Sequence, residues 1–311
     1  MRRVSEVGEF GLIERIARLA GRGRGGALVL GIGDDAAILR ARRGEAIVVT
    51  TDAFVAGVHF RFDQEAPVTA GRRAAVACLS DLAAMGARPL GLLLALAVPP
   101  RLPVARLLDF VGGMLVEARR QSTPLVGGNV TRARELSATL TALGAVAPGR
   151  ALRRDRGRAG DRLFVTGVLG RSALERAIGR VRHVPSARLV AGARLARLRD
   201  VGACIDVSDG LAADLGHLCR ASRVAARIDP GRLPRPAGFA RACRRAGLDP
   251  ERLALAGGED YELLFSLRGR GPAAAALTRR LGLPVTEIGR LEAGPPRVQG
   301  VPAGSRGFRH F

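Results

Sequence analysis

Apolar residues recur along the chain in two spacings. A spacing of three or four residues, typical of a helix with one buried face, predicts helices over 10–20, 70–85, 104–119, 172–179, 187–198, 211–221, 237–246 and 272–281. Short apolar or β-branched runs predict strands over 27–31, 46–51, 92–98, 138–147, 162–166, 204–207, 224–228, 262–267 and 285–291. Because the two kinds of element are interleaved throughout, the pattern predicts the α/β class.

A polar segment rich in Arg and Gly, at 148–161, interrupts this alternation. Its composition is typical of a connector. The chain has 311 residues, which suits two domains of ordinary size. We therefore expect two α/β domains, an N-terminal one over 1–148 and a C-terminal one over 149–311.

No segment resembles a leader or a membrane span. The start, MRRVSEVGEF, has no apolar core, and the longest apolar run, LGLLLALAV at 90–98, is much shorter than a bilayer requires. We expect a soluble, cytoplasmic protein with no membrane partner. The four cysteines (Cys78, Cys204, Cys219 and Cys243) form no CxxC pair, so we expect buried, reduced thiols rather than disulfides or zinc ligands.

The net charge of +22 raises the question of a nucleic-acid partner. All 50 basic residues are arginine, a bias that GC-rich codons explain without such a partner. The arginines are spread along the chain and only 4% of residues are aromatic, so stacking platforms for single strands are scarce. We expect no specific nucleic-acid binding and keep a basic nucleic-acid-binding protein as the alternative from another class. The absence of lysine excludes a Schiff base and a Walker-type phosphate loop.

Acidic and hydroxyl side chains gather at strand ends and beside glycine pairs. They are Asp34 and Asp35 in GIGDDAAIL, Thr50, Thr51 and Asp52 in TTDAF, Asp81 in CLSDLAAM, Asn129 after the expected turn Gly127-Gly128, Asp206, Ser208 and Asp209 in DVSDG, and Glu259 and Asp260 after Gly257-Gly258. Oxygen ligands select hard cations such as Mg²⁺, and glycine turns let main-chain N–H groups approach phosphate. The set predicts phosphoryl transfer assisted by several magnesium ions.

Each motif also has a simpler explanation. Asp209 or Ser208 could cap the helix that follows, and Asp34-Asp35 could be turn residues. His59 could be an ordinary surface or core histidine. Asp81 is harder to explain in this way, because apolar residues flank it in its helix and a buried carboxylate needs a partner.

Strand geometry makes the DVSDG segment a candidate metal site. Asp206 and Ser208 share one face of an extended strand, and the turn brings Asp209 to the helix start, where free N–H groups favour an anion or phosphate. Asp214 lies five positions beyond Asp209, off that face. We expect Asp214 to be solvated or to pack the helix.

The strings GEFGLI, GIGDDAA, TTDAFVAGVHF, SDLAAMGARP, VGGN, DVSDGLAADLGHL and GGEDYELLF, in this order, resemble the thiamine-monophosphate kinase family of the aminoimidazole ribonucleotide synthetase-like superfamily. The match runs from Gly8 to the final GFRHF. The resemblance implies that superfamily's fold and the ATP-dependent phosphorylation of thiamine monophosphate to thiamine diphosphate. It also implies several bound Mg²⁺ ions and a homodimer whose N-terminal sheets pair.

The resemblance also implies a role for each matching position. The magnesium ligands would be Asp35, Thr50, Thr51, Asp52, Asp81, Asn129, Asp206 and Asp209. ATP would contact Gly128, Asn129, Arg154 and Ser208, and thiamine monophosphate would contact His59, Glu259 and Phe308. Asn129 departs from the Asp of many members, so one ligand is neutral. Phe308 replaces the usual Trp or Tyr, so stacking on the substrate survives and a side-chain hydrogen bond does not.

The chemistry implied by the resemblance agrees with the residues that the chain lacks. Thiamine monophosphate already presents an ionised phosphate oxygen, so alignment and charge neutralisation suffice and no strong general base is needed. We therefore expect direct in-line transfer, with His59 as a substrate contact. Other ATP-dependent enzymes of the superfamily are the nearest alternatives. A selenophosphate synthetase would need a reactive Cys and a Lys near the N-terminus, and a hydrogenase-maturation dehydratase would need a C-terminal Cys.

Overall fold

The computed structural model describes residues 2–21, 27–32, 36–269 and 271–302. Contacts between residues divide the chain into two compact units. We call them the N-terminal unit (Met1–Leu82 with Arg88–Pro148) and the C-terminal unit (Ala83–Ala87 with Gly149–Phe311). Each unit has its own sheet and its own buried core.

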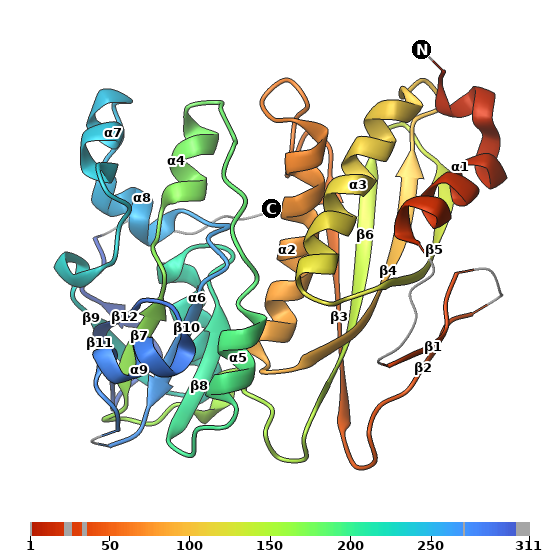
Figure 1. Ribbon diagram of the computed structural model, residues 1–311. Helices are drawn as coiled ribbons and strands as arrows, with labels where there is room; N and C mark the ends of the chain where they lie inside the picture. The colour runs from red at the N-terminus through yellow and green to blue at the C-terminus, as the bar shows by residue number, and fades with distance from the viewer. Residues whose placement is uncertain (1, 22–26, 33–35, 270, 303–311) are drawn as a thin grey trace. The chain divides into compact units, whose positions relative to one another are not determined.

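The N-terminal unit is built on a four-stranded sheet whose helices lie on one face (Figure 1). β6 is antiparallel to both β3 and β4, whereas β4 and β5 are parallel. The strands follow the order β3 (Ala46–Val55), β6 (Ser137–Val146), β4 (Arg88–Val98) and β5 (Leu125–Arg132). The other elements are the helices α1 (Val4–Ala20), α2 (Pro67–Ala84) and α3 (Val104–Arg120) and the strand pair β1 (Leu28–Leu30) and β2 (Ile38–Leu39).

Side-chain burial alternates along the strands of this sheet. In β4, Leu94 and Leu96 are buried, whereas Ala95 between them is exposed. In the edge strand β3, Ile47 and Val49 are 51% and 61% exposed. This period of two separates a face under the helices from a face that the described helices leave uncovered. Because β3 ends the sheet, one of its edges has no strand partner within the described chain.

The C-terminal unit is built on a six-stranded sheet that is buried on both faces in its centre. One face packs Ile205 and Leu264 against Leu215 of the helix α6 (Leu211–Ser222). On the other face Phe164 and Phe265 stack with their ring centres 5.5 Å apart. The strands follow the order β12 (Val298–Gln299), β9 (Ala225–Ile228), β11 (Val285–Glu292), β7 (Arg162–Thr166), β10 (Leu263–Leu267) and β8 (Val201–Asp206).

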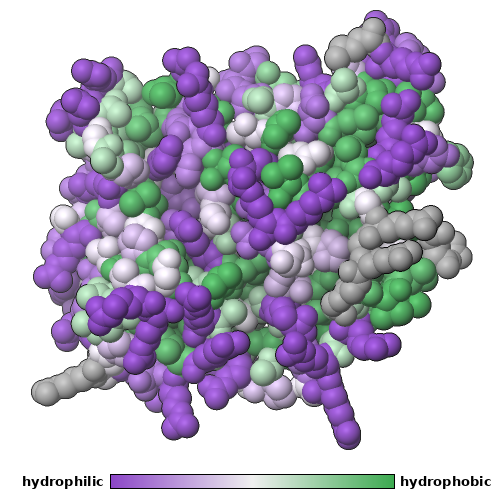
Figure 2. Space-filling view, in the orientation of Figure 1, coloured by the Kyte–Doolittle hydropathy of each residue, from purple (hydrophilic) through white to green (hydrophobic). Residues whose placement is uncertain are grey.

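Short helices make most of the connections in the C-terminal unit. They are η1 (Arg154–Arg156), α4 (Arg171–Ala177), α5 (Leu189–Leu195), η2 (Pro230–Arg232), α7 (Phe239–Arg245), α8 (Pro250–Ala256) and α9 (Ala274–Leu281). Figure 2 shows hydrophilic side chains spread over the visible face and interspersed with apolar ones, rather than gathered into one stripe. In the described chain, no helix combines the length and the apolar character that crossing a membrane requires.

The predicted α/β class is confirmed, and the four cysteines are free and buried as predicted. The expected turn at Gly127-Gly128 is wrong, because these residues lie within β5. A Cβ atom at Gly128 would come within 1.9 Å of the carbonyl oxygen of Leu94 in β4. The glycine therefore permits a close approach between two strands rather than a change of direction. The sequence pattern also misses α8, β2 and β12.

Candidate active site

In the N-terminal unit, two carboxylates meet where β3 passes under α2. The hydroxyl of Thr50 donates a hydrogen bond to the carboxylate of Asp81. Asp52 is on the same face of β3 as Thr50, two residues further on. Burial, and then the negative charge of Asp81, raise the pKa of Asp52 to about 6. A bound cation would offset both effects, so this oxygen-only group fits a hard divalent metal.

Thr51 is directed to the opposite face of the same strand. Its hydroxyl donates to the carbonyl oxygen of Leu140 at 3.1 Å and lies 3.1 Å from the hydroxyl of Thr141. Consecutive side chains in a strand point in opposite directions, so the Thr51 hydroxyl does not join Thr50 and Asp52. The resemblance implies all three residues as ligands; the structure adds that the Thr51 side chain lies on the other face of the strand.

Gly128 and Asn129 lie at the other edge of this sheet. Strand pairing places Asp52 opposite Leu140, Leu140 opposite Leu94, and Leu94 opposite Gly128. Three strand spacings amount to roughly 14 Å. Asn129 is exposed and pairs with Ala95, so its amide is on the uncovered face. Within one chain, the structure therefore does not bring Asn129 together with Asp52 and Asp81.

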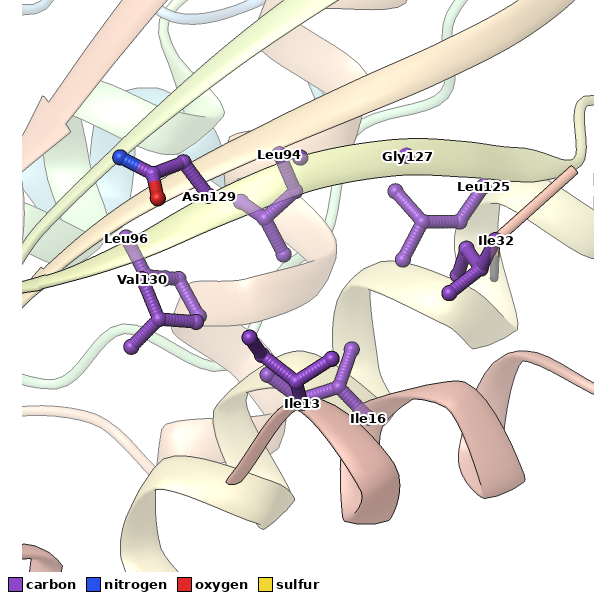
Figure 3. A pocket seen from close by; sticks show the side chains of 10 residues that line it. Ile13, Ile16, Ile32, Leu94, Leu96, Leu125, Gly127, Asn129 and Val130 are labelled. Carbon is purple, nitrogen blue, oxygen red and sulfur yellow. The ribbon is translucent and has the colours of Figure 1, made fainter. Parts of the chain in front are cut away.

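A pocket of about 70 Å³ lies beside Gly128, between α1 and the strands β4 and β5 (Figure 3). Its lining is mainly aliphatic, with Ile13 and Ile16 from α1 facing Leu96 and Val130. Figure 3 shows the amide of Asn129 on the far side of β5 from these isoleucines. The pocket is thus an apolar space next to a strand segment that has no side chain at Gly128.

His59 follows β3 in a short turn and is partly buried. Its Nδ1 accepts a hydrogen bond from the main-chain N–H of Val55 at 3.0 Å, and its ring stacks on Phe54. The guanidinium of Arg73 donates to the His59 carbonyl at 3.1 Å and pairs with Glu65. The contacts with Val55 and Phe54 fix the orientation of the imidazole.

In the C-terminal unit, three carboxylates surround the junction of β8 and α6. Asp206 ends β8 and is only 2% exposed, and Asp209 is partly exposed. Asp214, in the first turn of α6, is also 2% exposed. Burial, and then the charges of Asp206 and Asp209, raise the pKa of Asp214 to about 8.

Asp214 is buried, which contradicts the first of the two expected environments, solvent, and leaves the second, packing within the helix. Its Oδ2 accepts hydrogen bonds from the main-chain N–H groups of Ser208, Asp209 and Gly210. These three N–H groups, which precede the first residue of α6, are therefore bound by a side chain of the protein itself. Neither Ser208 nor Asp209 caps α6, because the cap position is Gly210 and no side chain caps it.

The segment 257–262 (the GGED loop) packs directly against this junction. The N–H of Glu259 donates to the Ser208 carbonyl at 2.7 Å, and the N–H of Tyr261 donates to the Val207 carbonyl at 2.8 Å. Glu259 and Tyr261 both have left-handed backbone conformations, with φ of 64° and 51°. A Cβ atom at Gly258 would come within 2.4 Å of the Ser208 carbonyl oxygen, so the contact requires glycine there.

Each carboxylate of the GGED loop has a different partner. Glu259 pairs with Arg176 of α4, whose guanidinium also donates to the Gly258 carbonyl at 3.2 Å. Asp260 is buried and accepts from the N–H groups of Gly170 and Ser172 at 2.6 and 3.4 Å. Burial is the main cause that raises the pKa of Asp260 to about 7.

Glu262, the third carboxylate of the loop, accepts from the Thr166 hydroxyl and pairs with Arg188. Sequence patterns do not indicate Glu262, Arg176 and Arg188 as parts of this arrangement. Their partners are distant along the chain, so local spacing carried no signal for them. For Glu262 one signal was available: a carboxylate just before a buried strand requires a partner.

Arg154 lies in η1, which packs against α6. Its side chain is exposed, and its carbonyl oxygen accepts from the hydroxyl of Ser222 at 2.6 Å. Burial lowers the pKa of His217, and the positive charges of Arg220 and Arg154 lower it further. The negative charge of Asp209 acts in the opposite direction and offsets part of this effect. Arg154 and Asp209 therefore border the same surface of the C-terminal unit.

Two predicted site residues, Asp35 and Phe308, lie outside the described residues, as does Asp34. Within the described ranges, no three His, Cys, Asp or Glu side chains form a group able to hold a metal. The predicted ligands instead occur as smaller groups: Thr50, Asp52 and Asp81 in one unit, and Asp206 and Asp209 in the other.

Comparison with known proteins places the chain in a class. The pattern of the AIR synthase related protein, N-terminal domain, matches residues 33–146, and that of the C-terminal domain matches residues 158–300. The chain is thus an AIR synthase-related protein with both domains of that class.

Relatives narrow the class to one family. Thiamine-monophosphate kinase of Escherichia coli (strain K12) is 41% identical over 309 residues, covering 92% of this chain and 91% of that protein. The crystal structure of thiamine-monophosphate kinase from Stenotrophomonas maltophilia K279a has 38% identity and a TM-score of 0.82, covering 94% of this chain and 96% of that one. AaThiL complexed with AMPPCP and TMP has 29% identity and a TM-score of 0.76, covering 100% and 99%. This chain belongs to the thiamine-monophosphate kinase family.

Proposed function

We propose that this chain transfers the terminal phosphoryl group of ATP to thiamine monophosphate, forming thiamine diphosphate and ADP. The observation that carries the proposal is the pairing of Asp52 and Asp81 beside the Thr50 hydroxyl in a protein of this family. A buried carboxylate whose charge is disfavoured by burial and by a second carboxylate, beside a hydroxyl oxygen, suits a metal-assisted phosphoryl transfer.

Magnesium would be held by Asp52, Asp81 and Thr50 in the N-terminal unit and by Asp206 and Asp209 in the C-terminal unit. Asp35, the main chain of Thr51, and Asn129 complete the proposed set. When bound, Mg²⁺ supplies neutralisation of the phosphate charge that develops during transfer. The chain's own contribution is to fix these oxygens before the substrates arrive: Thr50 holds Asp81, and Asp214 holds the loop that carries Asp209.

The acceptor oxygen needs no general base, because a phosphate monoester is ionised at neutral pH. The chain therefore has to align the two substrates rather than remove a proton. Gly128, Asn129, Arg154 and Ser208 would contact ATP. His59, Glu259 and Phe308 would contact thiamine monophosphate. Their support is the fixed orientation of the His59 imidazole by Val55 and of the Glu259 carboxylate by Arg176.

The active form would be a homodimer that pairs the N-terminal sheets. Its support is the uncovered face of that sheet and the open edge of β3, where Ile47 and Val49 are exposed. An open edge with apolar side chains is a ready site for strand pairing. A variant with Ile47→Asp and Val49→Lys should elute as a monomer in size-exclusion chromatography with light scattering; an unchanged dimer would contradict this interface.

One assay tests the proposed reaction. Purified protein is incubated with ATP, Mg²⁺ and either thiamine monophosphate or thiamine, and the products are identified by mass spectrometry. We expect thiamine diphosphate from the monophosphate and no phosphorylation of thiamine, whose hydroxyl would need a base. Equal turnover of both would refute the mechanism, and ATP use without either product would favour another enzyme of the superfamily. DNA retention without magnesium-dependent ATP turnover would favour the nucleic-acid-binding alternative.

A further inference from the structure

The loop between β8 and α6, residues 208–210, is folded around a single carboxylate oxygen. Asp214 Oδ2 accepts from the main-chain N–H groups of Ser208, Asp209 and Gly210 at 3.0, 3.1 and 3.1 Å. Consecutive N–H groups that converge on one point form a concave acceptor site, and here the acceptor is a side chain of the protein. Because Asp214 is 2% exposed, water does not replace it as the acceptor.

We infer that Asp214 is a positioning residue for this reaction: it shapes the 208–210 loop so that Ser208 and Asp209 present their side chains to nucleotide and metal. The roles of Ser208 and Asp209 rest on the proposed function. The hydrogen bonds that hold their main chain do not, so the two statements can fail separately.

The opposite side of the loop is held by a different segment. Glu259 donates its N–H to the Ser208 carbonyl at 2.7 Å, and Gly258 approaches that carbonyl too closely to carry a Cβ atom. The loop therefore has its carbonyl side fixed by the GGED loop and its N–H side fixed by Asp214. Main-chain donors that lose their acceptor are left unsatisfied, so removing Asp214 favours a different loop conformation.

Asp214 also lies beside the like charges of Asp206 and Asp209. An apolar residue at this buried helix position would avoid that repulsion. One carboxyl oxygen of Asp214 satisfies three main-chain donors at once. This explains why an acidic residue is buried next to two other acidic residues.

The experiment compares wild type with Asp214→Leu, Asp214→Asn and Leu218→Ala. Leucine removes the acceptor at similar size, and asparagine keeps one oxygen that can accept. Leu218 lies on the same helix and is fully buried in the hydrophobic core that also contains Leu215. Leu218→Ala is therefore a matched control, because it lowers stability without removing a hydrogen-bond partner of the loop. The measurements are the melting temperature, hydrogen–deuterium exchange of the peptide 204–215, the Kd of Mg²⁺-AMPPCP, and separate KM values for ATP and thiamine monophosphate.

We expect Asp214→Leu to accelerate exchange in this peptide and to weaken Mg²⁺-AMPPCP binding at least ~10-fold, the effect of one lost buried hydrogen bond. The KM for thiamine monophosphate should change less than about twofold, and Asp214→Asn should recover most of the binding. Leu218→Ala should lower the melting temperature and leave both exchange and nucleotide affinity near wild type.

The inference is overturned if Asp214→Leu matches wild type both in the hydrogen–deuterium exchange of the peptide 204–215 and in the Kd of Mg²⁺-AMPPCP. It is also overturned if Leu218→Ala, at the same loss of melting temperature as Asp214→Leu, weakens nucleotide binding by the same factor. A wild type that does not phosphorylate thiamine monophosphate refutes the proposed function instead, and the exchange measurement still tests whether Asp214 holds the loop.

Discussion

The hydroxyl of Thr50 donates a hydrogen bond to the carboxylate of Asp81, although the two residues are 31 positions apart. This bond joins β3 to α2 and orients a proposed metal ligand. We expect Thr50→Val to lower magnesium-dependent turnover about 10-fold to 100-fold, because an isosteric side chain removes the orienting donor and one oxygen ligand. Thr51→Val is the matched control from the opposite face of the strand and should retain most activity. An equal loss of turnover in Thr50→Val and Thr51→Val would contradict a specific role for the Thr50 hydroxyl on its face of β3.

Asp81→Asn tests the carboxylate itself. The variant should remain folded and lose at least ~100-fold in rate, since a lost metal ligand removes a few kcal/mol of transition-state stabilisation. Asp63→Asn provides the control, because Asp63 is exposed and pairs with the nearby Arg61. Steady-state kinetics with circular dichroism separates rate from folding, and near wild-type activity of Asp81→Asn would make Asp81 a structural residue.

The two glycines of β5 should differ in their tolerance of alanine. Gly128→Ala places a methyl group against the Leu94 carbonyl oxygen, whereas Gly127→Ala meets only a Leu93 side-chain atom, at 3.1 Å. We expect Gly128→Ala to destabilise the protein by about 1–3 kcal/mol and to weaken ATP binding. Gly127→Ala should cost clearly less, because a side chain moves more easily than a strand. Chemical denaturation and nucleotide titration of the pair measure both effects, and identical midpoints would contradict the close approach.

Asp260 should make stability depend on pH. Its pKa rises from 3.8 in the unfolded chain to about 7 in the folded one, chiefly through burial. The folded state therefore binds this proton more tightly, and the stabilisation present below pH ~4 is lost as pH rises towards about 7. Asp260→Asn keeps an acceptor for Gly170 and has no such proton. Between pH 4 and 8, wild type should lose at most about 4 kcal/mol relative to Asp260→Asn in denaturant titrations. Parallel pH profiles would show that Asp260 is ionised throughout.

Ligand removal tests Asp206. Without a metal, the buried carboxylates of the β8–α6 junction repel, so Mg²⁺-nucleotide should raise the melting temperature of wild type by several degrees through mass action. Asp206→Asn relieves part of the repulsion and removes a ligand, and should lose most of that increase. Asp209→Asn should behave similarly. If Mg²⁺-nucleotide stabilises Asp206→Asn as much as wild type, Asp206 is not a ligand.

Much of this molecule follows from local sequence. Helix and strand periods predicted the α/β class and most elements, because one buried face imposes a spacing that neighbouring residues share. Residue chemistry alone singled out Asp52, Asp81, Asp206 and Asp209, since carboxylates beside apolar segments need a compensating partner. The same argument applies to Asp214, but its position off the face of Asp209 left two environments open, solvent or packing within the helix, and gave no sign of its three main-chain partners.

Tertiary structure decided which side chains share a face and what each carboxylate contacts. Thr51 is separated from Thr50 by the alternation of an edge strand, and Asn129 is separated from Asp52 by the strand order. Arg176 and Glu259 pair across a long stretch of chain, and Gly128 is required by a neighbouring strand rather than by a turn. The spacing of residues along the chain cannot predict these contacts, because each depends on which distant segments the fold brings together. The sequence alone thus determined the kind of chemistry available. The packing of β3 on α2, and of the GGED loop on the β8–α6 junction, decided which of the candidate residues lie together, because only the fold brings distant segments into contact.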